Sequence, residues 1–314
     1  MASGMLPQDL VVRLLSMLPV ISLLRFRCVC KAWCELIDNP SFIAKHLNYG
    51  TYSKNECIIL KRFIEQRSKN VLSFVSEETL DVISTDIDVP FFDHQYVQLL
   101  GTCNGIICLA YKGEIVLCNP ATREFKALPP CINDYLPGLM HSELGLGFGF
   151  DGRSNDYKVV RIFRLYYEGP LDYYNPVAVK ADIYNLSTDS WRKLDSVPNV
   201  LFDYCFQPLL NGAFHWDVLH EKEDPYVSIL SFHLSSEVFG EIPYPDIYSY
   251  PDHKSKSVGV LNNEYLALIL YVDSHVDKYF DIWVMKEYGV KESWTKQFTV
   301  GPVLGINSPL SVGK

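Results

Sequence analysis

The feature that most limits how this chain can fold is a short unit that recurs four times after residue 100. Each copy has an apolar strand pattern, a polar turn and an aromatic residue that opens the next strand pattern. The four aromatics are Phe125, Trp191, Phe239 and Trp294, so they lie 66, 48 and 55 residues apart. Such intervals suit a four-stranded propeller blade, which takes about 40–50 residues plus loop insertions.

The pattern between these turns indicates an all-β body. Apolar residues alternate over short runs bounded by polar turns, from residues 57–63 to residues 294–298. Short alternating runs of this kind are typical of β-strands. Four candidate strands follow one another between Gly145 and Leu194, as one blade requires. A two-sheet sandwich produces the same alternation, so it remains an alternative to the propeller.

The end of the chain bears on whether the ring of blades is complete. About four units are legible, and residues 308–314 look like the start of another strand. A propeller must close its ring to avoid bare strand edges. Either the strands predicted at residues 57–75 help to close it, or the chain is truncated at its C-terminus. We expect truncation.

Residues 6–47 follow a helical pattern instead. Leucines at helical spacing predict a first helix that ends at Pro19, and Ser22 is a plausible N-cap for a second. A third helix is predicted to stop at Asn39-Pro40, with Phe42 on a last turn or two. Three helices in fewer than 50 residues cannot cover so many large apolar side chains. We therefore expect an interface of upwards of ~1,000 Å² here.

The net charge also differs between the helical N-terminal segment and the rest of the chain. The chain carries a net charge of −9, and residues 1–50 hold five basic and three acidic residues. The remainder therefore holds 23 basic and 34 acidic residues, a net charge of −11. An acidic body argues against nucleic acid as a partner, because phosphates require a basic footprint. It favours a basic protein partner through electrostatic steering, or it serves solubility alone.

Cysteines and hydropathy indicate a protein that is not exported. The nine cysteines are scattered, and none forms a C-x-x-C pair, so neither a disulfide framework nor a zinc site is signalled. No stretch has the 18 or more apolar residues that a membrane span requires, and no signal peptide is recognisable. We expect a cytoplasmic protein without contact to a membrane, and a nuclear location in addition stays open.

None of the candidate catalytic motifs has all the residues that its chemistry requires. Gly145-x-Gly147-x-Gly149 lacks the lysine of a phosphate loop and alternates with apolar residues as a strand does. His215 and His220 do not form a metalloprotease pair, and no serine lies in a G-x-S-x-G turn. We therefore expect a protein that is not an enzyme, without a metal or cofactor.

Two tyrosine-rich stretches are the better candidates for recognition. Tyrosine gives a large contact area for little entropy cost, and neighbouring acids suit basic groups on a target. Loops pinned to the surface by their own aromatics are an equally good explanation. The candidate target-binding residues are Tyr166, Tyr167, Glu168, Asp172, Tyr173, Tyr174, Asp246, Tyr248, Tyr250 and Asp252.

The N-terminal segment closely resembles the F-box motif. The matching residues are Leu6-Pro7-x-Asp9-Leu10, Leu14-Leu15-x-x-Leu18-Pro19, Ser22–Lys31 with Trp33, and Leu36-Ile37-x-x-Pro40-x-Phe42. The resemblance implies docking on a Skp-type adaptor, which bridges to a cullin and its RING subunit. Trp33 has internal packing as an alternative role. The implied adaptor-binding residues are Leu6, Pro7, Leu10, Leu14, Leu15, Leu18, Pro19, Leu23, Leu24, Val29, Trp33 and Ile37.

The body resembles the plant F-box-associated domain of type 1, which is kelch-like. The resemblance rests on residues 101–109, 119–123, 145–161 and 186–191, and residues 282–294 resemble S-locus F-box (SLF) proteins. Members usually continue for several strands beyond the Pro-Leu-x-Val element, which agrees with truncation. The implied fold is α+β and multidomain, with a three-helix F-box at 1–48 and a propeller-like domain, incomplete at its C-terminus, at 49–314.

The implied function is substrate recognition in an SCF-type E3 ubiquitin ligase. For S-locus proteins the implied targets are non-self S-ribonucleases (S-RNases) in pollen, within self-incompatibility. Two alternatives stay open. One is a carbohydrate-binding or sugar-hydrolysing β-domain with incidental helices, and the other is a truncated, non-functional SLF-like allele.

Overall fold

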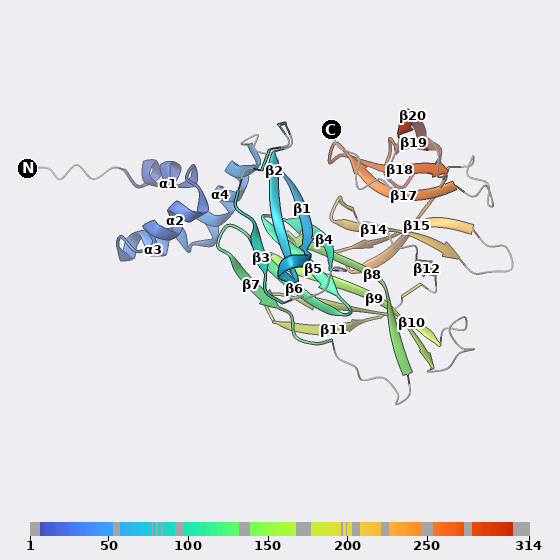
Figure 1. Cartoon of the computed structure of the whole chain (residues 1–314), viewed down its shortest axis with the longest axis horizontal. Coiled ribbons are helices and arrows are strands. Elements are labelled where there is room, and N and C mark those ends of the chain that lie inside the picture. The colour runs from blue at the N-terminus through green and yellow to red at the C-terminus, as the bar shows by residue number, and fades with distance from the viewer. Residues whose placement is uncertain are drawn as a thin grey trace, which may run out of the picture. The chain divides into compact units, whose positions relative to one another are not determined.

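The computed structural model describes residues 7–52, 57–76, 78–79, 81–82, 84–91, 97–131, 139–167, 177–195, 197–198, 200–202, 208–220, 226–245, 254–272 and 278–303. Four helices come first, and strands fill most of the rest (Figure 1). The helices are α1 (Gln8–Ser16), α2 (Val20–Phe26), α3 (Lys31–Ile37) and α4 (Pro40–Tyr52).

The fourth helix is longer than the sequence pattern predicts. Where a last turn or two was predicted, α4 runs for 13 residues. Asn39 accepts a hydrogen bond at its side-chain oxygen from the Ser41 backbone N–H at 2.9 Å, as an N-cap does. Pro40 fits the first turn, where its missing N–H costs no helical bond. From the sequence alone, Pro40 predicts only the end of the preceding helix, α3.

The second helix begins earlier than predicted. The Pro19 carbonyl accepts hydrogen bonds from the backbone N–H groups of Ser22 (2.9 Å) and Leu23 (3.1 Å). Ser22 therefore lies inside α2 and is not its N-cap. The predicted domain boundary at residue 48 remains a prediction, although α4 continues across it to Tyr52 and β1 begins at Cys57.

The strands form five separate antiparallel sheets. The first contains β1 (Cys57–Ile64), β2 (Lys69–Ser76) and β3 (Ile87–Val89), and the second β4 (Gln98–Cys103), β5 (Ile106–Tyr111), β6 (Glu114–Asn119) and β7 (Glu124–Ala127). The third contains β8 (Leu139–Asp151), β9 (Asp156–Tyr167), β10 (Ala178–Asn185) and β11 (Ser190–Leu194). The fourth contains β12 (Leu201–Phe202), β13 (Leu209–Leu210), β14 (Ala213–His220), β15 (Tyr226–His233) and β16 (Val238–Pro243). The fifth contains β17 (Lys254–Leu261), β18 (Tyr265–Val272), β19 (Lys278–Met285) and β20 (Trp294–Val303).

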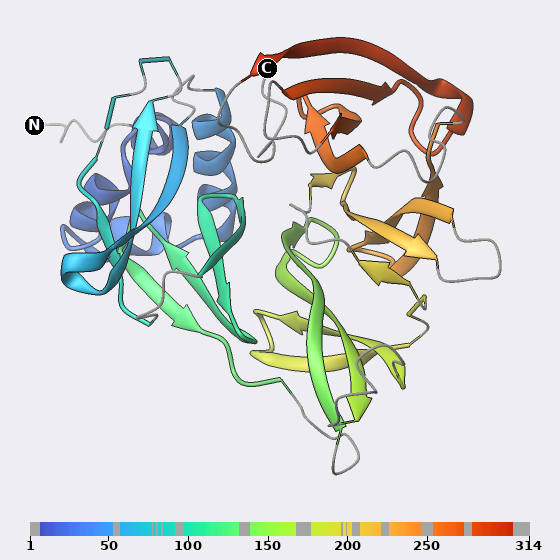
Figure 2. The same cartoon turned by 45° about the vertical axis from the view of Figure 1, so that its right-hand side comes forward.

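Neighbours in the chain are mostly neighbours in a sheet, which is the up-and-down order of propeller blades. In Figure 2 the third sheet runs from green to yellow and the fifth from orange to red. The described strands thus form five blade-like sheets, and five separate sheets exclude the two-sheet sandwich. The four repeats found in the sequence correspond to the second to fifth sheets. The sequence repeat does not include the first sheet, whose described part has three strands instead of four.

Two of the repeated aromatics fix their sheets in the same way. The indole N–H of Trp191 donates a hydrogen bond to the Pro129 carbonyl at 2.8 Å, and that of Trp294 donates to the Pro243 carbonyl at 3.0 Å. Each carbonyl belongs to the chain that leads out of the preceding sheet. In both cases, a tryptophan near the start of an outer strand thus forms a hydrogen bond that joins this strand to the segment that leads into the sheet.

The chain divides into two compact units. The first holds the helices, the first sheet and most of the second, and its sheets enclose a core that includes Leu72, Ile107 and Leu109. The second unit holds the third to fifth sheets, with Trp216 and Phe232 in the core between the third and fourth. Among the residues that the structure describes, no helix combines the length and apolar character needed to cross a membrane.

The glycine-rich motif of the third sheet lies in a strand, as its alternation with apolar residues predicts. Gly147 belongs to β8, and a Cβ built on it would lie 2.7 Å from a ring carbon of Phe214 in β14. A Cβ on Gly149 would lie 3.0 Å from a methyl group of Leu234. The glycines therefore let the fourth sheet approach closely, and they do not form a loop that could hold a phosphate.

Candidate functional site

The helix α1 and its C-cap residue Met17 carry two apolar stripes that are one residue out of phase. Leu10, Leu14 and Met17 are 41%, 49% and 51% exposed, and we name them the outer stripe. The next position after Leu14 is Leu15, which is only 3% exposed and belongs to the core of the helices. One face of α1 thus holds the module together while the other presents apolar surface to solvent.

The structure divides the predicted adaptor-binding residues between these two environments, and Leu6 lies outside the described residues. The buried members pack within the helices together with Phe42. Trp33 contacts Phe26 edge to face, with ring centroids 5.3 Å apart, which supports a packing role for this tryptophan. Exposed are Pro7, Leu10, Leu14, Pro19 and Val29; half-buried are Leu18, Leu24 and Trp33; buried are Leu15, Leu23 and Ile37.

The motif match alone missed three exposed apolar side chains. Met17, Ile21 and Ile43 are each about half exposed, beside the predicted residues. Met17 continues the spacing of Leu10 and Leu14, so helical phase would have found it. Ile21 and Ile43 gave no such signal, because they lie on α2 and α4 and only the tertiary fold decides which of their faces is covered.

A second exposed apolar group lies at one end of the third sheet. Met140, Tyr167 and Val177 are 45%, 50% and 49% exposed. Met140 pairs with Tyr166 across β8 and β9, and the Val177 N–H donates to the Leu165 carbonyl at 2.8 Å, so the three residues gather where these strands end. Tyr166 and Tyr167 were predicted as target-binding residues. The other eight, Glu168, Asp172, Tyr173, Tyr174, Asp246, Tyr248, Tyr250 and Asp252, lie outside the described residues.

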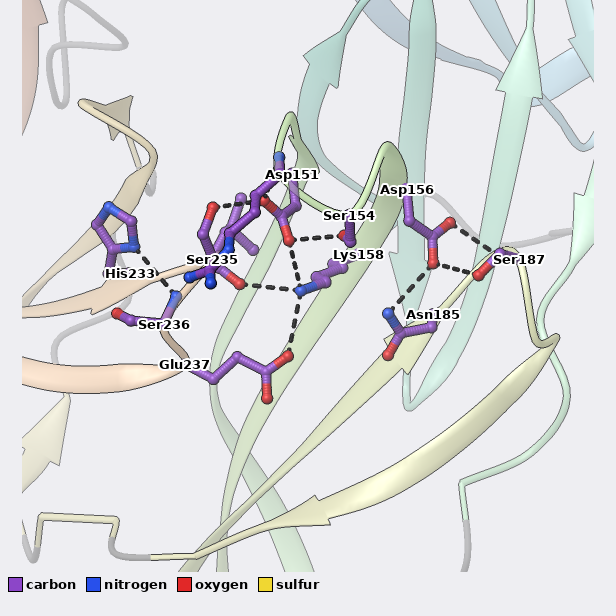
Figure 3. A network of polar contacts seen from close by, with 12 residues as sticks. Asp151, Ser154, Asp156, Lys158, Asn185, Ser187, His233, Ser235, Ser236 and Glu237 are labelled. Carbon is purple, nitrogen blue, oxygen red and sulfur yellow. Dashed lines mark hydrogen bonds and ion pairs between the residues drawn. The ribbon is translucent and has the colours of Figure 1, made fainter.

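A buried ionic network joins the third and fourth sheets (Figure 3). The Lys158 ammonium lies 2.8 Å from a carboxylate oxygen of Asp151, and it donates to the Leu234 carbonyl at 3.0 Å and to Glu237 at 3.1 Å. Ser154 and Ser235 also donate to Asp151. Burial by itself would raise the pKa of Asp151, but Lys158 and the two hydroxyls hold it well below its usual range. The network is a structural clamp, and its groups are satisfied by one another.

His215 shows a similar structural use of a titratable group. Its Nδ1 lies 3.2 Å from the Pro208 carbonyl and its Nε2 lies 2.7 Å from the Tyr288 hydroxyl. A carbonyl only accepts, so Nδ1 carries the proton and Nε2 accepts from Tyr288. Burial lowers the pKa of His215 to about 4. This histidine is thus neutral at physiological pH and belongs to the packing.

The buried histidine makes the protein sensitive to acid. Because its pKa is lowered in the folded chain, His215 contributes stability above its unfolded pKa near 6.5, and this contribution is lost as pH falls toward about 4. We expect the free energy of unfolding to drop by roughly 2 kcal/mol between pH 7.5 and pH 5 from this group. Urea unfolding at both pH values should show a smaller drop in His215→Gln. Equal drops in both proteins would contradict the assignment.

Among the described residues, no three histidine, cysteine, aspartate or glutamate side chains gather closely enough to hold a metal ion. Two exposed apolar surfaces of the described chain, one on the helices and one on the third sheet, include residues that the sequence predicts as binding residues.

The fold defines a protein in which helices with an outward apolar stripe precede a β-propeller. The F-box domain matches residues 4–45, and the F-box associated beta propeller domain matches residues 58–312. The chain belongs to the F-box proteins that carry this propeller domain. F-box proteins of this kind are typically non-catalytic substrate adaptors of SCF ubiquitin ligases.

Similar proteins occur in Arabidopsis thaliana. F-box protein At3g07870 is 30% identical, with 95% of this chain and 73% of that protein covered. F-box protein CPR1 is 30% identical, with 94% and 73% covered. F-box/kelch-repeat protein At3g23880 is 27% identical, with 97% and 82% covered. The matches span both the helices and the propeller, so they support the family for the chain as a whole.

Proposed function

We propose that this chain is the substrate-recognition subunit of an SCF-type ubiquitin ligase. The observation that carries this proposal is the outer stripe of Leu10, Leu14 and Met17, which the chain's own helices leave exposed. Helices of a Skp-like adaptor would cover this stripe together with Ile21, Val29 and Ile43, and the adaptor would bring the cullin and its RING subunit. The chain itself performs no chemistry in this role.

The propeller would hold the protein target. Binding raises the local concentration of target lysines at the ubiquitin-charged enzyme, which accelerates transfer without any catalytic residue in this chain. The exposed group Met140, Tyr167 and Val177 suits such a contact, because it includes a predicted target-binding residue and because aromatic and apolar anchors dominate binding energy. A receptor of this kind would work in the cytoplasm, and a location in the nucleus as well is compatible with the same role.

The charge of the body supports a basic target. Residues 51–314 carry a net charge of −11, which would steer a cationic protein toward the propeller. Non-self S-RNases in pollen fit this chemistry, as the S-locus resemblance implied. Residues 282–294, which carry that resemblance, include Met285 and Trp294 in the core beside the fourth sheet, so charge is the stronger support. Recombinant S-RNase that fails to bind even at low salt would rule this target out.

Adaptor binding provides the decisive test. In Leu10→Asp with Leu14→Asp, two carboxylates would have to enter the apolar interface, so we expect the Kd for a purified Skp-type adaptor to rise at least about 100-fold. Both side chains are exposed, so the far-UV circular dichroism and the unfolding midpoint should stay close to those of the unchanged chain. Titration calorimetry measures the Kd.

A matched control tests whether weaker adaptor binding is specific to the outer stripe or follows from any two charges added to the surface. Ile58→Asp with Phe298→Asp places the same two charges at exposed apolar positions on β1 and β20. This control should bind the adaptor as the unchanged chain does. If the Leu10/Leu14 variant also binds normally, the helices do not dock on the adaptor and the proposal is refuted.

A further inference from the structure

The connection between α2 and α3 presents two cysteines beside the most exposed apolar residue of the proposed docking surface. Cys28 and Cys30 are exposed free thiols on either side of Val29, which is 61% exposed. The Cys28 thiol lies 3.9 Å from the Leu24 carbonyl and remains accessible. Any group attached to either sulfur would therefore occupy the surface that the adaptor would cover.

The same corner concentrates positive charge. Arg25, Arg27 and Lys31 lie within the seven residues 25–31, all three are exposed, and no acidic residue separates them. Arg27 is paired with Asp38 at 2.8 Å, which leaves Arg25 and Lys31 as the nearby cations outside that pair. A cationic surface favours the approach of an anionic reagent.

The described thiols outside the four helices are less suited to reaction. Burial raises the pKa of Cys57, Cys103, Cys108, Cys118 and Cys131, in the case of Cys118 to about 11. Since the thiolate is the nucleophile, a raised pKa slows attack on a disulfide at neutral pH. Exposure, charge and position thus coincide at Cys28 and Cys30.

We propose that Cys28 and Cys30 form a thiol-modification site for anionic disulfides of the glutathione class, and that an adduct there blocks docking on the adaptor. This inference rests on the proposed function. The cysteine thiol loses its proton, and its sulfur attacks one sulfur of glutathione disulfide. A new S–S bond forms to one glutathione, the original S–S bond breaks, and the released thiolate takes up a proton. Excess thiol reverses the exchange.

The adduct would act by charge and by volume. A glutathionyl group carries net negative charge and ionised carboxylates, which are costly to bury in an apolar interface without partners. We therefore expect the adaptor Kd to rise at least about tenfold on modification, and to recover fully after reduction with dithiothreitol.

The experiment measures modification and binding separately on the full chain. The purified chain is treated with glutathione disulfide, adducts are located by peptide mass spectrometry, and the adaptor Kd is determined before treatment, after treatment and after reduction. Cys28→Ser with Cys30→Ser should bind the adaptor normally and lose the sensitivity to glutathione disulfide. Cys57→Ser, which removes a thiol of β1 outside the docking surface, should keep it. Adaptor bound beforehand should protect Cys28 and Cys30 from modification.

The outcomes distinguish the two proposals. If the reduced chain binds the adaptor but no adduct forms at Cys28 or Cys30, or if an adduct forms without weakening binding, the modification site is refuted and docking stands. If the reduced chain does not bind the adaptor, both proposals fail.

Discussion

Lys158→Met is expected to lower the free energy of unfolding by about 3–5 kcal/mol, because it breaks a buried ion pair and leaves a carboxylate without its cation. Lys158 is 4% exposed and Asp151 is 2% exposed, so water cannot replace the lost contact. Lys158 also holds the Leu234 carbonyl and Glu237, so the variant weakens the joint between the third and fourth sheets. Urea unfolding monitored by tryptophan fluorescence measures the change.

An exposed pair provides the control for this result. Lys69→Met removes an ion pair with Asp88 whose two side chains are each 50% exposed, and it should cost only about 0–1 kcal/mol. Asp151→Leu in the Lys158→Met background should recover part of the lost stability, since no unpaired charge is then buried. A cost for Lys158→Met no greater than that for Lys69→Met would show that the clamp contributes little.

Trp216→Ala is the second large effect, at about 3–5 kcal/mol of stability. Trp216 is 1% exposed, contacts Phe214 with ring centroids 5.7 Å apart, and donates from its indole N–H to the Leu146 carbonyl at 3.3 Å. Removing it leaves a cavity between the third and fourth sheets and takes a donor from a buried carbonyl. Thermal unfolding should show a markedly lower midpoint.

Two further variants show how much of the stability lost in Trp216→Ala comes from the indole N–H and how much from the buried position. Trp216→Phe keeps most of the volume but lacks the N–H, so it should be clearly milder than Trp216→Ala. Tyr279→Ala removes an exposed aromatic from β19 and should change stability by no more than about 0.5 kcal/mol. Similar losses for Trp216→Ala and Tyr279→Ala would contradict the position of Trp216 in the core.

Local sequence signals were sufficient for most of the fold. Four of the five blades could be predicted because Phe125, Trp191, Phe239 and Trp294 each open an outer strand. The fourth helix was underestimated because Pro40 suits both the end of one helix and the start of the next, and only the Asn39 cap distinguishes the two cases. Proline by itself marks a boundary, and it does not determine whether a new helix begins there.

The candidate site was predictable to a lesser degree. The motif match identified Leu10, Leu14, Leu15 and Leu23 together, although the structure exposes the first two and buries the others. A motif records which positions are apolar, whereas burial depends on how the helices pack. The network of Asp151 and Lys158 with Glu237 had no sequence signal, because Lys158 and Glu237 are 79 residues apart and meet only when two blades associate.

The one-residue offset between the two stripes of α1 has a practical use. Charges placed on the outer stripe leave the buried stripe, and hence the folded helices, intact. On the proposed function, a chain altered in this way would still hold its target through the propeller but would no longer deliver it to the ligase. Expressed in the native tissue, such a chain would accumulate its client instead of destroying it, which makes it a capture reagent for identifying that client.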